Sequence, residues 1–168
     1  DGLYRLDAGM YEAETMTHLL TPWGSDRAAL GFFRIGAPPG LPAGLGEVDR
    51  LLESITLLGY SLQPMAERQW ALTLAWCAES PVTEDYAVFV HLVDEAGEIA
   101  AQRDAPPGGG FYPTRYWTQD EVVLDHHELE LPADTPGGVY RLLVGLYHPE
   151  NGRRLMAADG SDWLELQT

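Results

Sequence analysis

The stretch from residue 69 to residue 79 (QWALTLAWCAE) constrains the fold more than any other part of the chain, because large and small side chains alternate along it. One face carries the large residues Trp70, Leu72, Leu74 and Trp76. The other face carries the small residues Ala71, Thr73, Ala75 and Cys77. A period of two is the repeat of a β-strand, and large apolar groups on one side indicate that the strand covers a core.

Segments of the same kind follow along the rest of the chain. We expect strands at residues 54–62, 69–79, 86–94, 98–103, 121–131, 139–148, 153–157 and 163–167. Turns rich in glycine, proline, asparagine and aspartate separate them at intervals of roughly 10–15 residues, and no long helical period appears after residue 50. The sequence therefore predicts an all-β fold, an immunoglobulin-like β-sandwich of about seven or eight strands. A jelly roll is the alternative, because it has the same sequence statistics.

Three residues within these strands predict local features. Gly59 interrupts an apolar strand and indicates a β-bulge. The alternation in residues 121–131 slips near Asp125, which indicates a second bulge. Tyr140 follows a Pro-Gly-Gly turn, where a tyrosine corner would bond its hydroxyl group back to the turn.

The first 50 residues are less regular than the rest. Residues 10–20 fit either a short helix or a strand, and residues 28–35 are expected to form a strand. Residues 37–46 are rich in proline and glycine and are typical of a linker or a long crossover. We expect residues 1–50 to be an N-terminal extension that packs on the sandwich or contributes strands to it, and residues 51–168 to be the sandwich domain.

The charge of the chain excludes several classes of function. The sequence has 10 basic and 26 acidic residues and a net charge of −16. Nucleic acid binding needs clustered lysine and arginine, and an anionic membrane surface repels an acidic chain. No apolar run approaches the ~18 residues that span a bilayer, so we predict no membrane insertion of this segment.

The sequence contains no pattern that identifies an enzyme, and we predict a non-catalytic chain. The Gly-x-Ser-x-Gly motif of hydrolases is absent. Cys77 lies among small residues in the middle of a strand, where a buried and inert thiol is expected. Asp120, Glu121, Asp125, Glu128 and Glu130 cluster in sequence, and we interpret them as a solvated strand rim rather than as the paired carboxylates of a glycosidase.

The histidines and acidic turns give no metal or cofactor prediction. His126 and His127 are adjacent on a strand and should point to opposite faces, so they do not form one metal site. His91 lies on a buried strand and is interpreted as a core histidine with one hydrogen bond. Acidic turns at residues 94–95 and 159–162 have oxygen ligands suited to calcium, but such turns more often bond to their own backbone.

The loop at residues 106–117 (PPGGGFYPTRYW) is the candidate binding site. It carries five side chains suited to recognition, namely Phe111, Tyr112, Arg115, Tyr116 and Trp117. Aromatic rings stack on the apolar faces of sugars, and tyrosine, tryptophan and arginine are also frequent in protein interfaces. The alternative is that these aromatic side chains only cap the end of the sandwich core.

Several segments, taken in order, resemble a known family: 55–60 (ITLLGY), 86–92 (YAVFVHL), 106–113 (PPGGGFYP), 138–147 (GVYRLLVGLY) and 151–155 (NGRRL). Over about residues 54–157 they are similar to the C-terminal β-sandwich regions that follow membrane-embedded, mannosyltransferase-type glycosyltransferase-like proteins of bacteria. The resemblance implies an extracytoplasmic accessory or interaction domain, with a glycan or an envelope protein as its partner. A carbohydrate-binding module that uses the loop at residues 106–117 is the alternative function.

Overall fold

The computed structural model describes residues 2–20, 25–37 and 39–166. The chain forms two compact units, residues 1–38 and residues 39–168. The division therefore lies at residues 38–39, whereas the sequence placed it at residue 50. The expected end of the strand 163–167, at Gln167, lies outside the described residues.

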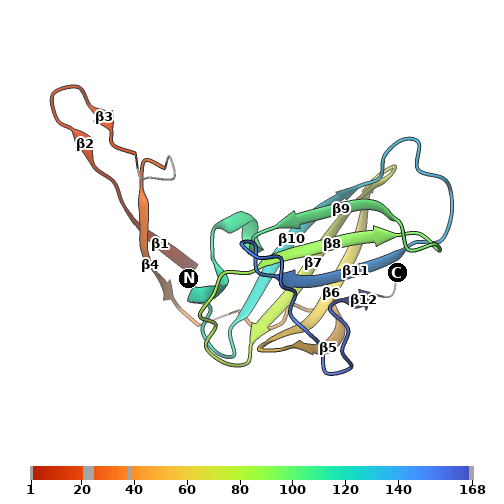
Figure 1. Cartoon of the computed structure of the whole chain (residues 1–168). Coiled ribbons are helices and arrows are strands. Elements are labelled where there is room, and N and C mark those ends of the chain that lie inside the picture. Colours follow the sequence, from red (N-terminus) through yellow and green to blue (C-terminus); the bar gives the residue numbers. More distant parts are fainter. Residues whose placement is uncertain (1, 21–24, 38, 167–168) are drawn as a thin grey trace. The chain divides into compact units, whose positions relative to one another are not determined.

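The second unit is a β-sandwich built from two four-stranded antiparallel sheets (Figure 1). One sheet has the strand order β10-β7-β6-β5 and the other has the order β12-β11-β8-β9. The strands are β5 (Gly46–Leu52), β6 (Ile55–Ala66), β7 (Gln69–Ala78), β8 (Ala87–Val93), β9 (Ile99–Ala105), β10 (Val122–Glu130), β11 (Arg141–Tyr147) and β12 (Leu164–Leu166). The prediction of an all-β sandwich is confirmed. No helix in the described part of the chain is long and apolar enough to cross a membrane.

The core lies between the two sheets and follows the alternation seen in the sequence. On β7, the inward side chains of Leu72, Leu74 and Trp76 are fully buried. Phe89 is also buried, but on the opposite face of β8 from Leu92, where it lies against Gly145 of β11 and under the guanidinium group of Arg154. A Cβ atom at Gly145 would lie only 2.5 Å from Cζ of Phe89, so a larger residue there would displace the ring.

Two predictions about irregular strand positions have opposite outcomes. The bulge at Gly59 is confirmed, because the register between β6 and β7 shifts between Leu57 and Gly59. The bulge near Asp125 is wrong, because β10 pairs with β7 in one unbroken register from Val122 to Glu130. Asp125 and His127 occupy inward positions of a regular strand. Because polar residues stand where apolar ones are expected, the alternation in the sequence looks interrupted although the strand is not.

Two strand predictions also need correction. The strand β5 was missed, because its sequence reads as part of a Pro- and Gly-rich linker and a charged segment. The predicted strand at residues 153–157 is wrong. This segment makes two isolated bridges, from Arg154 to Tyr147 and from Ala157 to Leu52, and no regular ladder.

The first unit is a β-hairpin that carries a smaller hairpin within it. The strands β1 (Gly2–Ala8) and β4 (Ala28–Ile35) pair in antiparallel fashion. Residues 10–20, which fitted a helix or a strand, form the short strands β2 (Tyr11–Glu12) and β3 (Thr17–His18). The rings of Tyr4 and Phe33 stack across β1 and β4 with centroids 5.5 Å apart.

The two ends of the sandwich, called the closed end and the open end, are built differently. The closed end carries the long connection from β9 to β10, which includes the 3₁₀ turns η1 (Pro107–Gly110) and η2 (Thr114–Tyr116). The open end carries the β8–β9 turn, residues 94–98, and the connection from β10 to β11, residues 131–140.

Candidate functional site

The predicted aromatic loop folds down onto the closed end, and its two central rings are buried. Tyr112 is 6% exposed and Trp117 is 3% exposed. The hydroxyl group of Tyr112 donates to the carbonyl oxygen of Tyr116 over 2.7 Å, and Nε1 of Trp117 donates to the carbonyl oxygen of Tyr112 over 3.1 Å. These two side chains hold the loop together, and their ring faces are not available to a ligand.

The buried carboxyl group of Glu121 holds the same loop by hydrogen bonds. Glu121 is buried, and its Oε2 accepts hydrogen bonds from the hydroxyl group of Tyr112, the backbone N–H of Thr118 and the hydroxyl group of Thr118. Glu121 therefore belongs to the interior of the closed end and not to a solvated rim.

A second buried polar pair, on β10, anchors η1. Oδ2 of Asp125 lies 2.6 Å from Nε2 of His127, and Oδ1 of Asp125 accepts the backbone N–H of Gly108. Gly108, Gly109 and Gly110 all have positive φ angles, which explains why the turn needs three glycines. His127 and His126 point to opposite sides of the strand as predicted, since His127 is buried and His126 is exposed.

The surface of the loop keeps few groups for recognition. Phe111 is 44% exposed, and Tyr116 is half-buried. Arg115 is exposed, but its guanidinium group binds Asp85, and this partner raises the pKa of Arg115. The structure thus brings the five predicted residues together in one loop, with two of them inside it. Glycan binding there stays a prediction that depends on Phe111, Tyr116 and Arg115.

The open end differs, because an apolar cleft of about 350 Å³ enters the sandwich between the two sheets. Leu62, Trp70 and Leu129 line it from one sheet. Leu92, Ala101 and Leu142 line it from the other sheet. Its volume falls within the roughly 300–1,000 Å³ of typical ligand pockets, and its lining is predominantly apolar, as in those pockets.

Hydrogen bonds to the loop at residues 131–140 keep the mouth of this cleft in place. The guanidinium group of Arg68 donates to the carbonyl oxygens of Pro132 and Thr135 over 2.6 and 3.0 Å. The hydroxyl group of Tyr140 donates to the carbonyl oxygen of Pro136 over 2.7 Å, which confirms the predicted bond from Tyr140 back to its turn. These bonds fix the backbone at the mouth, so the shape of the cleft is determined by the fold.

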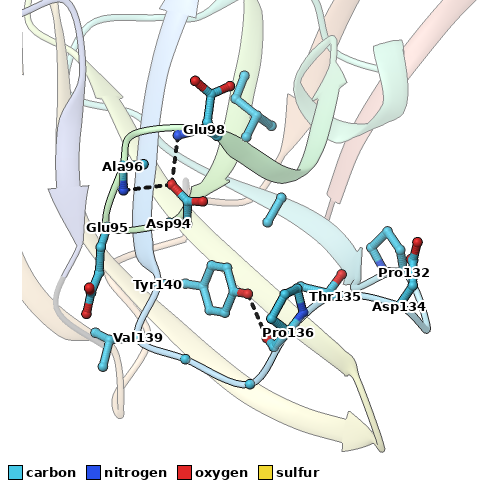
Figure 2. A pocket seen from close by; sticks show the side chains of 14 residues that line it. Asp94, Glu95, Ala96, Glu98, Pro132, Asp134, Thr135, Pro136, Val139 and Tyr140 are labelled. Atoms are coloured by element: carbon cyan, nitrogen blue, oxygen red, sulfur yellow. Dashed lines mark hydrogen bonds between the residues drawn. The ribbon is translucent and has the colours of Figure 1, made fainter.

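A second hollow of about 680 Å³ lies beside the same loop, and Figure 2 shows it from close by. We call it the acidic groove. Glu95 and Glu98 of the β8–β9 turn and Asp134 of the loop stand around it. Asp94 also lines it, but its Oδ1 accepts the backbone N–H groups of Ala96 and Glu98, so this carboxylate shapes the turn.

Neither hollow of the open end was predicted from the sequence. Residues 132–138 (PADTPGG) and 94–98 (DEAGE) read as plain turns, and the inward leucines read as ordinary core. One signal was present, because Ile99 and Val139 are β-branched apolar residues directly next to these turns. Val139 is 72% exposed and Ile99 is 50% exposed.

The described residues contain no group of three or more histidine, cysteine, aspartate or glutamate side chains that could hold a metal ion. Asp94 and Asp159, from the two acidic turns, accept hydrogen bonds from their own turns. His91 is half-buried and bonds to Asp104, in accord with its interpretation as a core histidine. Burial raises the pKa of the Cys77 thiol, with a further increase from Glu79, so the reactive thiolate form is disfavoured.

No protein-family model matches the chain, and no curated protein matches it significantly.

Proposed function

We propose that this chain is a non-catalytic interaction domain that binds through the open end of its sandwich. The apolar cleft between the two sheets is the observation that carries this proposal. At the closed end, Trp117 and Tyr112 are packed inside the molecule. At the open end, Trp70 and Leu92 are only half-buried and line a hollow. A partner that fills the hollow would bury apolar surface, which favours binding by about 25 cal/mol per Å² before the costs of association.

A non-catalytic role fits the chemistry of the buried polar groups. Oε2 of Glu121 accepts three hydrogen bonds, and the carboxyl group of Asp125 is shared between His127 and the turn η1. Each of these groups fixes the loop of the closed end. Catalysis requires acidic or basic groups that converge on a cleft. The apolar cleft is lined mainly by apolar residues, and the carboxylates of the acidic groove stand exposed on separate turns.

The test is binding of a neutral apolar probe, N-phenyl-1-naphthylamine, followed by its fluorescence and by ¹⁵N chemical shifts of the protein. We expect saturable binding with shifts at Leu92, Ala101 and Leu142. The variant Ala101→Phe places a ring in the cleft and should abolish the binding. Ala158→Phe, at an exposed position outside the cleft, is the matched control and should bind as the natural chain does.

Two results would overturn the proposal. One is the absence of saturable binding, and the other is binding that Ala101→Phe leaves unchanged. A parallel titration with a panel of envelope-type oligosaccharides examines the carbohydrate-binding alternative. Shifts confined to Phe111, Arg115 and Tyr116 in that titration would favour the loop of the closed end as the binding site.

A further inference from the structure

The acidic groove has an unusual charge environment for this chain. The sequence has no lysine, and all ten of its basic residues are arginines. Seven arginines form ion pairs with carboxylates in the described part of the chain. Among the described residues, no arginine or histidine lines the acidic groove. Within that same part, the side chains of Glu95, Glu98 and Asp134 form no hydrogen bond or ion pair, so no described side chain neutralises their charges.

The groove combines this charge with exposed apolar surface. Ile99 and Val139 lie in its lining, and both are at least half exposed to solvent. Residues 135–138 and Tyr140 border both the acidic groove and the apolar cleft, so the two hollows share a wall. Arg68 lines the cleft, and its guanidinium group is already bound to the carbonyl oxygens of Pro132 and Thr135, two residues that also line the acidic groove.

We propose that the acidic groove is the docking site for a basic peptide segment of a partner protein, in which lysine or arginine residues flank an apolar side chain. This inference rests on the proposed function of the open end. The cations of the segment would pair with Glu95, Glu98 and Asp134, and its apolar side chain would cover Val139 and Ile99. Complementary charge sets the choice of partner and the rate of association, while the apolar contact contributes affinity.

The experiment uses three fluorescein-labelled hexapeptides and the whole chain. The first has two central leucines with two lysines on each side, the second has glutamates in place of the lysines, and the third has glycines in place of the leucines. We expect only the first peptide to bind tightly, with ¹⁵N shifts at Glu98, Ile99 and Val139. Its affinity should fall as salt rises, because the ion pairs lie at an exposed rim.

Two triple variants separate a docking site from the general negative field of the chain. The groove variant carries Glu95→Gln, Glu98→Gln and Asp134→Asn. The control variant carries Glu79→Gln, Asp120→Asn and Glu150→Gln, the same set of substitutions at exposed positions of the closed end. The groove variant should weaken the first peptide at least tenfold, and the control variant should weaken it less than threefold.

Each other outcome overturns the inference in a recognisable way. Equal weakening by both variants, or equal binding of the glycine peptide, would show that the net charge of −16 attracts the peptide without a specific site. Equal binding of the lysine and glutamate peptides at the open end would reject a basic partner but leave the proposed function intact. If no peptide binds, the groove is not a docking site, and the neutral probe still decides independently whether the cleft binds apolar groups.

Discussion

The two ends of the sandwich use the same kinds of residues for different purposes. At the closed end, a long loop with four aromatic rings packs Tyr112 and Trp117 inward and places Glu121 beneath them. At the open end, a shorter connection leaves a cleft between the sheets and exposes Val139. The difference teaches that aromatic content does not mark the binding end of a sandwich. At the closed end, the side chains of the loop pack against one another and form hydrogen bonds with one another, so they close the core. The open end is incompletely filled and is available to a partner.

The polar groups follow the same division. At the closed end, the carboxylates of Glu121 and Asp125 are buried and accept hydrogen bonds from the loop that they support. At the open end, Glu95, Glu98 and Asp134 are exposed around a groove. A buried acceptor that loses its donors carries a full desolvation cost, whereas an exposed carboxylate is solvated. Substitutions should therefore cost stability at the closed end and affect binding at the open end.

The largest expected difference in stability is between variants of the tryptophans at the two ends. Trp117→Ala should lower the free energy of unfolding by about 3–5 kcal/mol, because it removes a fully packed ring. Trp70→Ala at the cleft should lower it by only about 1–2 kcal/mol, because this ring is half-buried. Urea unfolding followed by circular dichroism measures both values. Equal losses would show that the two ends are packed alike.

The next effect concerns the buried carboxylate of the closed end. Glu121→Ala removes the acceptor of three hydrogen bonds and should cost about 2–3 kcal/mol. Glu121→Gln keeps an acceptor oxygen and should cost less, about 1 kcal/mol. Urea unfolding gives the stabilities, and hydrogen exchange at the amide of Thr118 reports the local bond. A glutamine variant as unstable as the alanine variant would mean that the negative charge, rather than the acceptor, holds the loop.

A third prediction compares one substitution at both ends. Ala78→Leu, at a fully buried position beside the closed end, should overpack the core and cost about 1–3 kcal/mol. Ala101→Leu, in the cleft, has space for the larger side chain and should change stability by less than about 1 kcal/mol, in the stabilising direction. Thermal unfolding of the two variants side by side measures the contrast. Destabilisation by Ala101→Leu would indicate that the cleft does not accept added groups.

The sequence predicted the framework of the fold well where one physical signal dominated. The alternation in residues 69–79 depends only on which face of a strand is buried, and β7 follows it. The bulge at Gly59 was predictable because a glycine inside an apolar strand often marks one. The structure adds that the backbone of Gly46 approaches Gly59 closely, since a Cβ atom there would lie 2.8 Å from the carbonyl oxygen of Gly46. Asp125 and His127 misled the prediction, because a polar pair can occupy core positions when its members bond to each other.

The site was harder to predict, because exposure depends on contacts between distant segments. The aromatic loop was identified from composition, which does not reveal that Trp117 donates to the carbonyl oxygen of Tyr112. The cleft of the open end is enclosed by six strands, and β10 pairs with β7 and β11 with β8 across long sequence separations. Its lining residues, such as Leu62 and Leu142, are indistinguishable in sequence from core leucines. Only the three-dimensional arrangement shows that the space between them is unfilled.

The smallest expected effect concerns the bond that holds the mouth of the cleft. Tyr140→Phe removes the donor to the carbonyl oxygen of Pro136 and should cost only about 0.5–1 kcal/mol, since the bond is near the surface. The local effect should exceed the global one, with faster hydrogen exchange at Thr135 and Val139. Tyr11→Phe, at an exposed tyrosine of the first unit, is the control and should leave both measurements unchanged. If Tyr140→Phe leaves exchange at the open end unaffected, Arg68 alone holds the loop, and the shape of the cleft does not depend on the tyrosine.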